Sequence, residues 1–115
     1  MSIYGRFCIV RSRNQGVVCG VVQAVSGRCV ELTDARQIHN WSGDLDGRHI
    51  NTLFEMATFG APTARISEPV PFILMTEACG VIPCTEDAEA NLRQSRWGAP
   101  YKPSASRGPK TKQRG

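Results

Sequence analysis

The sequence predicts a small, mainly β protein: an antiparallel barrel or sandwich of five to seven strands, with two short helices and an extended C-terminal arm. Three observations predict this class. The first third contains apolar runs separated by turn residues, only two short segments show helical spacing, and the last eighteen residues show neither pattern. A chain of 115 residues suits one domain with one modest core. We therefore expect a single β-rich domain over residues 1–97 and an arm over 98–115.

The first strands form a predicted meander. Residues 3–10 mix aromatic and aliphatic side chains, and polar turn residues follow them. Residues 17–25 are apolar at both odd and even positions, which is typical of a strand covered on both faces. Ser26 and Gly27 give a tight turn, after which residues 28–34 resume strand character. A further strand is expected over residues 35–41.

Helical spacing first appears at Leu53. The apolar residues recur at the interval of a helix from there to Phe59, and Thr52 with Glu55 fits the capping box that satisfies free amides at a helix start. Gly60 then ends the helix. With barely two turns, this helix depends on packing for its existence.

Strand character returns over residues 65–66 and 70–84. Pro71 places its strand at an edge of the sheet, or at a strand start, because proline cannot donate a ladder hydrogen bond.

A second helix follows Thr85, which is a good N-cap. Ala88, Leu92 and Ser95 form one stripe along it, and Gly98 is the expected C-cap glycine. We expect this helix to pack across one end of the barrel or onto a neighbouring subunit.

The net charge of +4 is unevenly distributed. Residues 1–97 hold nine Arg, no Lys and all ten acidic residues, a balance of −1. Residues 98–115 carry no acidic residue and a balance of +5, from Lys102, Arg107, Lys110, Lys112 and Arg114. Such an arm, rich in Pro, Gly and Ser, is predicted to be disordered or ordered by a partner, and its cations suit phosphates or a neighbouring subunit. A purely solubilising end is the alternative.

Several segments, taken in order, resemble a family of small bacteriophage-encoded proteins of unknown function: residues 9–11, 32–36, 41–43, 65–71, 73–78 and 82–86, with a terminal Trp97. The resemblance covers residues 6–97 and implies phage origin more strongly than any activity. Where that family shows a second arginine and two tryptophans, this chain has Gln37, His39 and only Trp41. The loop over residues 12–16 also differs, so a binding site at either element would be altered.

Arg36, His39 and Trp41 are the candidate contact residues of the domain. We expect them to project together from one face of the strand over 35–41. A guanidinium, an imidazole and an indole on one surface suit a nucleotide or an oligomer contact, through phosphate pairing and stacking. The alternative is structural: Trp41 closes the core, and Arg36 pairs with Asp34 or Asp44.

The five cysteines favour buried structural thiols over a metal site, because only Cys79 and Cys84 lie close together in the sequence. Disulfides would form only if the protein functions outside a reducing cytosol.

Two enzyme hypotheses are disfavoured. One uses Cys84, whose pKa the following helix would lower. The other uses the acid–base set Asp44, Asp46 and His49.

No apolar run approaches the ~20 residues of a membrane span. These observations predict a non-enzymatic phage structural or accessory protein without a cofactor, made in the host cytoplasm and carried in the virion. Its partners would be other phage structural proteins or itself, with nucleic acid contacted through the arm. The alternative is an early phage protein that binds a nucleotide ligand or a host factor.

Overall fold

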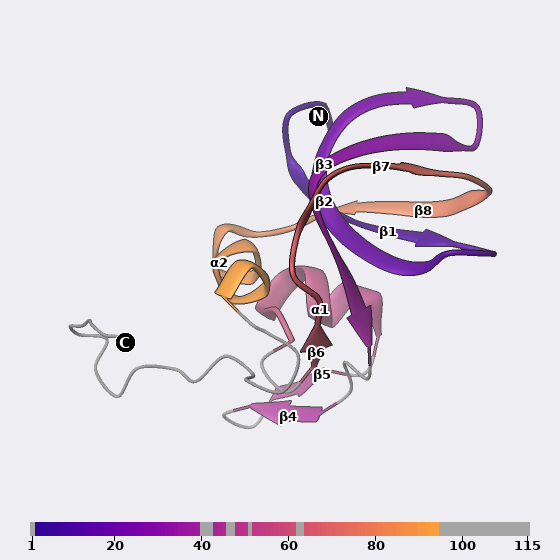
Figure 1. Cartoon of the computed structure of the whole chain (residues 1–115). Coiled ribbons are helices and arrows are strands. Elements are labelled where there is room, and N and C mark those ends of the chain that lie inside the picture. Colours follow the sequence, from indigo (N-terminus) through magenta and orange to yellow (C-terminus); the bar gives the residue numbers. More distant parts are fainter. Residues whose placement is uncertain (1, 40–42, 46–47, 51, 62–63, 95–115) are drawn as a thin grey trace.

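The computed structural model describes residues 2–39, 43–45, 48–50, 52–61 and 64–94 (Figure 1). Within these ranges the chain forms eight strands and two helices. The strands are β1 (Phe7–Ser12), β2 (Gly16–Ser26), β3 (Cys29–His39), β4 (Gly43–Leu45), β5 (Arg48–Ile50), β6 (Arg65–Ile66), β7 (Val70–Met75) and β8 (Ala78–Pro83). The helices are α1 (Leu53–Phe59) and α2 (Glu86–Gln94).

Six of these strands form one antiparallel sheet, which confirms the mainly β class with two helices. Its order is β6–β3–β2–β1–β8, and β7 pairs with the first half of β3 on the same edge that β6 uses further along. Strands β4 and β5 form a separate hairpin beside α1 (Figure 1). An open, strongly curved sheet is therefore the frame of the domain.

The barrel alternative is wrong, because the sheet is not closed. Only Thr76 and Glu77 connect β7 to β8, yet β7 pairs with β3 and β8 pairs with β1. Side chains of the β1–β2 turn bridge the resulting gap instead. The Ser12 hydroxyl donates to the Thr76 carbonyl at 2.6 Å, and the Gln15 amide side chain accepts from the Thr76 N–H at 2.6 Å. These bonds satisfy the backbone groups of Thr76 in the β7–β8 connection by side chains.

The strands expected over residues 28–34 and 35–41 are one strand, β3, with a bulge in the middle. The register with β2 shifts between Cys19 and Val21, and Asp34 has a φ of 50° at this point. Gly20 of β2 allows the bulge to pack closely: a Cβ there would lie 2.9 Å from the Thr33 carbonyl oxygen. Since a bulge sharpens local twist, it helps to curve the sheet.

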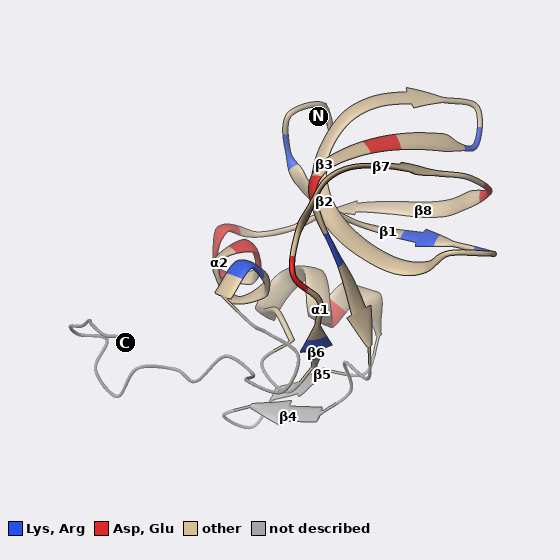
Figure 2. Cartoon of the chain, in the orientation of Figure 1, with Lys and Arg blue, Asp and Glu red and all other residues tan. Residues whose placement is uncertain are grey.

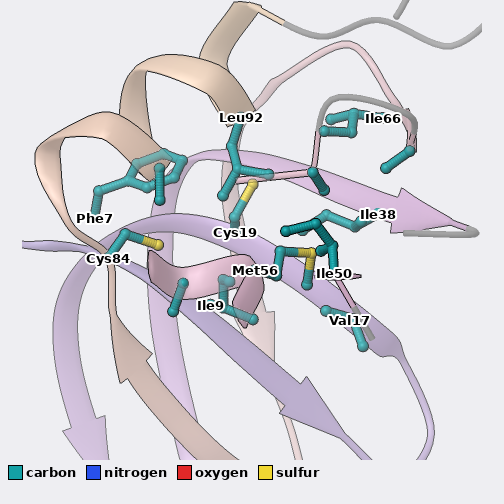
Figure 3. Packing of buried hydrophobic residues seen from close by; sticks show 14 residues of the cluster. Phe7, Ile9, Val17, Cys19, Ile38, Ile50, Met56, Ile66, Cys84 and Leu92 are labelled. Atoms are coloured by element: carbon teal, nitrogen blue, oxygen red, sulfur yellow. The ribbon is translucent and has the colours of Figure 1, made fainter. Parts of the chain in front are cut away.

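Both faces of the sheet are covered by apolar side chains. Val17 and Cys19 of β2 belong to a cluster with α1 and α2, whereas Val18 and Val22 belong to a second cluster inside the curve of the sheet. Figure 3 shows the first cluster, in which side chains from the sheet and from both helices point toward one another. The prediction that β2 is covered on both faces is confirmed for this part of the strand.

Helix α1 begins as the sequence predicts. The Thr52 side chain accepts from the Glu55 N–H, and the Glu55 carboxylate accepts from the Thr52 N–H at 2.8 Å. Gly60 ends the helix with φ 88° and ψ −168°. Only glycine populates this region readily, so the sequence and the backbone agree there.

Helix α2 packs within its own chain, against α1 and the sheet. The Thr85 hydroxyl accepts from the Ala88 N–H at 3.1 Å, which confirms the N-cap. Ala88 and Leu92 are fully buried, as the predicted stripe requires. The predicted continuation of the stripe at Ser95 and the C-cap at Gly98 lie outside the described residues.

Strand β7, which carries Pro71, lies at an edge of the sheet, as predicted.

Candidate functional site

The structure does not bring Arg36 and His39 together on one face, so that expectation is wrong. Positions three apart in a strand point to opposite sides of the pleat. Arg36 lies opposite Cys19 and is only 7% exposed, on the side of the helices. His39 is exposed and lies opposite Arg65 of β6. Trp41 lies outside the described residues.

Arg36 instead belongs to a polar cluster at the β3 bulge. Its Nη1 lies 3.4 Å from Asp34 Oδ2, the same oxygen that accepts a hydrogen bond from Arg93 of α2. Arg93 also donates to Glu89 at 2.9 Å and lies 4.6 Å from the centre of the Phe7 ring. Burial lowers the pKa of Arg93, but hydrogen bonds to Glu89 and Asp34 outweigh it and raise that pKa. The Arg36–Asp34 pair of the structural alternative is therefore confirmed, whereas Trp41, which that alternative places at the end of the core, lies outside the described residues.

Replacing Asp34 by asparagine is expected to lower the free energy of unfolding by about 1–2 kcal/mol, because both arginines lose their shared carboxylate. Asparagine tolerates a positive φ, so the change removes charge without adding strain. Urea denaturation measures the loss. Glu77→Gln is the matched control: its pair with Arg13 is 3.9 Å long and exposed, so we expect a change below about 0.5 kcal/mol. Equal effects of the two variants would contradict a structural role for the bulge cluster.

A second feature is an exposed apolar surface on β7. Val70, Phe72 and Leu74 alternate along this edge strand, and Phe72 and Leu74 are 53% and 44% exposed. Phe72 lies opposite Thr33 and Leu74 opposite Glu31, so these β3 side chains share the surface. We call these five residues the β7 face.

Sequence reasoning missed the β7 face, although a signal was present. Residues 70–75 are apolar at both odd and even positions, and Pro71 marks the strand as an edge. Met75 is buried and Ile73 is half-buried, on the inner side of the sheet. The other side therefore presents apolar side chains to solvent.

Two hollows border the same end of the sheet. The larger, of about 440 Å³, which we call the cationic hollow, is lined by the guanidinium groups of Arg11 and Arg13 and by the imidazole of His39, together with Ser12, Gln37 and neighbouring residues. The smaller, of about 280 Å³, lies where β7 begins and has an apolar lining that includes Val18, Val70 and Ile73. The cationic hollow suits an anion, because two guanidinium groups can pair with phosphate oxygens. Among the predicted contact residues that the structure describes, His39 lines this hollow and Arg36 lines the smaller one.

The cysteines divide into buried and accessible thiols. Cys8, Cys19 and Cys84 are buried, Cys29 is half-buried and Cys79 is exposed. Burial raises the pKa of the Cys8 thiol to about 11 and that of Cys19 to about 12, and it raises the pKa of Cys84 as well. The expectation that α2 lowers the pKa of Cys84 is therefore wrong, because burial removes the thiol from water and so disfavours the thiolate.

These shifts predict that the protein loses stability as the pH rises above about 8.5, the ordinary pKa of a thiol in an unfolded chain. Above that pH the unfolded chain releases thiol protons that the folded chain retains, so unfolding is favoured by up to ~1.4 kcal/mol per pH unit for each buried thiol. Urea denaturation between pH 8 and 9.5 measures this slope. We expect Cys19→Ala to reduce the slope, because this variant lacks one of the buried thiols. A slope equal to that of the wild type would refute the assignment.

Other candidate residues are only partly described. The β4–β5 register pairs Asp44 with His49, whereas Asp46 lies outside the described residues, as do all five cations of the arm: Lys102, Arg107, Lys110, Lys112 and Arg114. In the part of the chain that the structure describes, no three His, Cys, Asp or Glu residues are placed to hold a metal ion. No helix among the described residues has the length and apolar character needed to span a membrane.

The fold and its exposed edge define a small, mainly β domain built on an open antiparallel sheet. Residues 5–92 match the model of a family described as Domain of unknown function (DUF6948), and the chain belongs to that family. Comparison with curated proteins and with solved structures gives no match. The family description names neither an origin nor an activity, so phage origin stays a prediction.

Proposed function

We propose that this protein is a non-enzymatic structural or accessory protein of a bacteriophage particle, where it assembles with other subunits. The observation that carries the proposal is the β7 face, on which an edge strand presents Phe72 and Leu74 to solvent. Apolar surface of this kind favours contact with another protein, because association removes it from water. The resemblance of residues 6–97 supplies the phage context. The basic arm offers a second contact, to a neighbouring subunit or to nucleic acid.

The test is the protein content of phage particles. Particles are purified by gradient sedimentation from cells infected with a phage that encodes the chain, and the chain is quantified by mass spectrometry. We expect it to co-sediment with the particle at a fixed ratio to the major capsid protein, while an abundant host cytoplasmic protein is removed. A chain that is plentiful in the lysate but missing from the particles would refute the proposal.

The cationic hollow favours a second candidate function: an early phage protein that binds a nucleotide ligand or a host factor. Arg11 and Arg13 of this hollow supply guanidinium groups for phosphate, and His39 supplies an imidazole. This candidate replaces the predicted set of Arg36, His39 and Trp41 by residues that the structure places around one hollow. It needs no contribution from the β7 face.

Thermal-shift measurements with linear and cyclic nucleotides test this candidate. A nucleotide that binds the folded chain raises its melting temperature, and the double variant Arg11→Ala, Arg13→Ala should lose that rise. Arg28→Ala is the matched control, because Arg28 is exposed and follows the other end of β2. If no nucleotide stabilises the chain, or if the control variant loses the effect equally, the candidate fails.

A further inference from the structure

The β7 face combines an apolar centre with an acidic border. Glu31 lies directly across from Leu74 on β3, Glu68 precedes β7 by two residues, and Glu77 follows its end by two. Glu68 and Glu77 are exposed, and Glu77 makes only a long, exposed pair with Arg13, at 3.9 Å. Figure 2 shows acidic positions on β3 and at both ends of β7, while β7 itself carries no charge. A partner for this surface therefore needs apolar groups and positive charge together.

This border disfavours the packing of two β7 faces against each other. In a symmetric contact each face meets its own copy, so the glutamates of both copies would approach one another. Like charges across a contact are destabilising. The β7 face consequently fits a cationic partner better than a second β7 face.

The same chain contains a segment with the required chemistry. Residues 98–115 carry five cations and no acid, and Pro100, Tyr101 and Pro103 supply apolar groups among them. Proline three residues apart is the spacing of segments that bind in the extended polyproline II form. In that form the stretch from Lys102 to Lys110 would span roughly 25 Å, at ~3.1 Å per residue. The acidic border from Glu68 to Glu77 spans roughly 30 Å at ~3.3 Å per residue.

We infer that the β7 face binds the basic arm, residues 98–115, of a second copy of this chain. The inference rests on the proposed function as an assembling subunit and names the contact through which copies join. The chemistry of the two halves is complementary: the arm supplies apolar groups for Phe72 and Leu74 and cations for the glutamates. Because each copy supplies one arm and one face, the contact is head-to-tail and links copies into a ring or an open chain.

Mixing two full-length variants tests this arrangement. In the arm variant all five arm cations are replaced by glutamine; in the face variant, Phe72→Ser and Leu74→Ser are combined. We expect each variant to stay monomeric in analytical ultracentrifugation at low salt, because each lacks one half of the contact. A mixture should form a 1:1 heterodimer and nothing larger, since one intact arm and one intact face remain. About 0.5 M salt should weaken this heterodimer by about tenfold.

Controls separate the alternatives. Phe72 and Leu74 are exposed, so circular dichroism should show both variants folded, and Phe54→Ser, at a 71% exposed position on α1, should associate like the wild type. A mixture that stays monomeric would overturn the inference. That result is expected if the arm docks on its own chain, and also if the arm binds only nucleic acid. If the chain is present in particles while the mixture stays monomeric, the inference fails and the proposed function stands. If the mixture forms the heterodimer while the chain is absent from particles, the inference stands and the proposed function fails.

Discussion

Replacing Gly60 by alanine is expected to lower the free energy of unfolding by about 2–5 kcal/mol, from backbone strain and from overlap. Gly60 has φ 88° and ψ −168°, a conformation that a side chain makes costly. A Cβ at this position would lie 2.5 Å from the Asn91 side chain. Asn91 cannot move away freely, because it is buried and its Oδ1 accepts from the Ala61 N–H at 2.7 Å. Urea denaturation of the variant measures the loss.

Two other glycines provide matched controls. Gly27 has φ 59°, but a Cβ added there would meet no atom within 4 Å, so Gly27→Ala should cost only the strain, about 1–2 kcal/mol. Gly80 has neither a positive φ nor a close neighbour, and Gly80→Ala should be nearly neutral. If Gly60→Ala costs no more than Gly27→Ala, the contact with Asn91 does not constrain the α1–α2 junction.

Truncation of Leu92 to alanine is expected to cost about 2–5 kcal/mol, because it removes a fully buried side chain and leaves a cavity. Leu92 belongs to the cluster in which α2 meets α1 and the sheet (Figure 3). Alanine favours helix, so the loss reports packing rather than helix propensity. Both the urea midpoint and the melting temperature should fall.

Gln94→Ala is the matched control for Leu92→Ala. Gln94 lies two residues further along the same helix and is exposed, so its replacement should change stability by less than about 0.5 kcal/mol. Similar losses from the two substitutions would mean that α2 contributes little through its buried face.

Local chemistry made several elements predictable from the sequence. The capping box of Thr52 and Glu55, the glycine that ends α1 and the Thr85 N-cap depend on residues only a few positions apart. The edge position of β7 was predicted for a similar reason, because the missing N–H of Pro71 is a property of one residue. Each of these features is largely independent of distant parts of the chain.

The bulge at Asp34 was not predictable in this way. Residues 28–41 resemble two strands because the apolar pattern changes there, yet the chain continues as β3 with an extra residue opposite Gly20. That shift of register decides which side chains share a face. It puts Arg36 beside Cys19, among groups that α2 brings from far along the sequence. The separation of Arg36 from His39 has a simpler cause, the alternation of side chains along the strand.

By itself the sequence determined the mainly β class, the two helices and the separation of charge between residues 1–97 and the arm, since composition and short-range spacing encode these. Tertiary structure alone decided that the sheet stays open, that Arg36 is buried against Asp34, and that Phe72 and Leu74 face solvent beside Glu31. The physical reason is that closure and exposure depend on which strands become neighbours. Strand neighbours are set by packing between residues far apart in the chain, which local patterns do not encode.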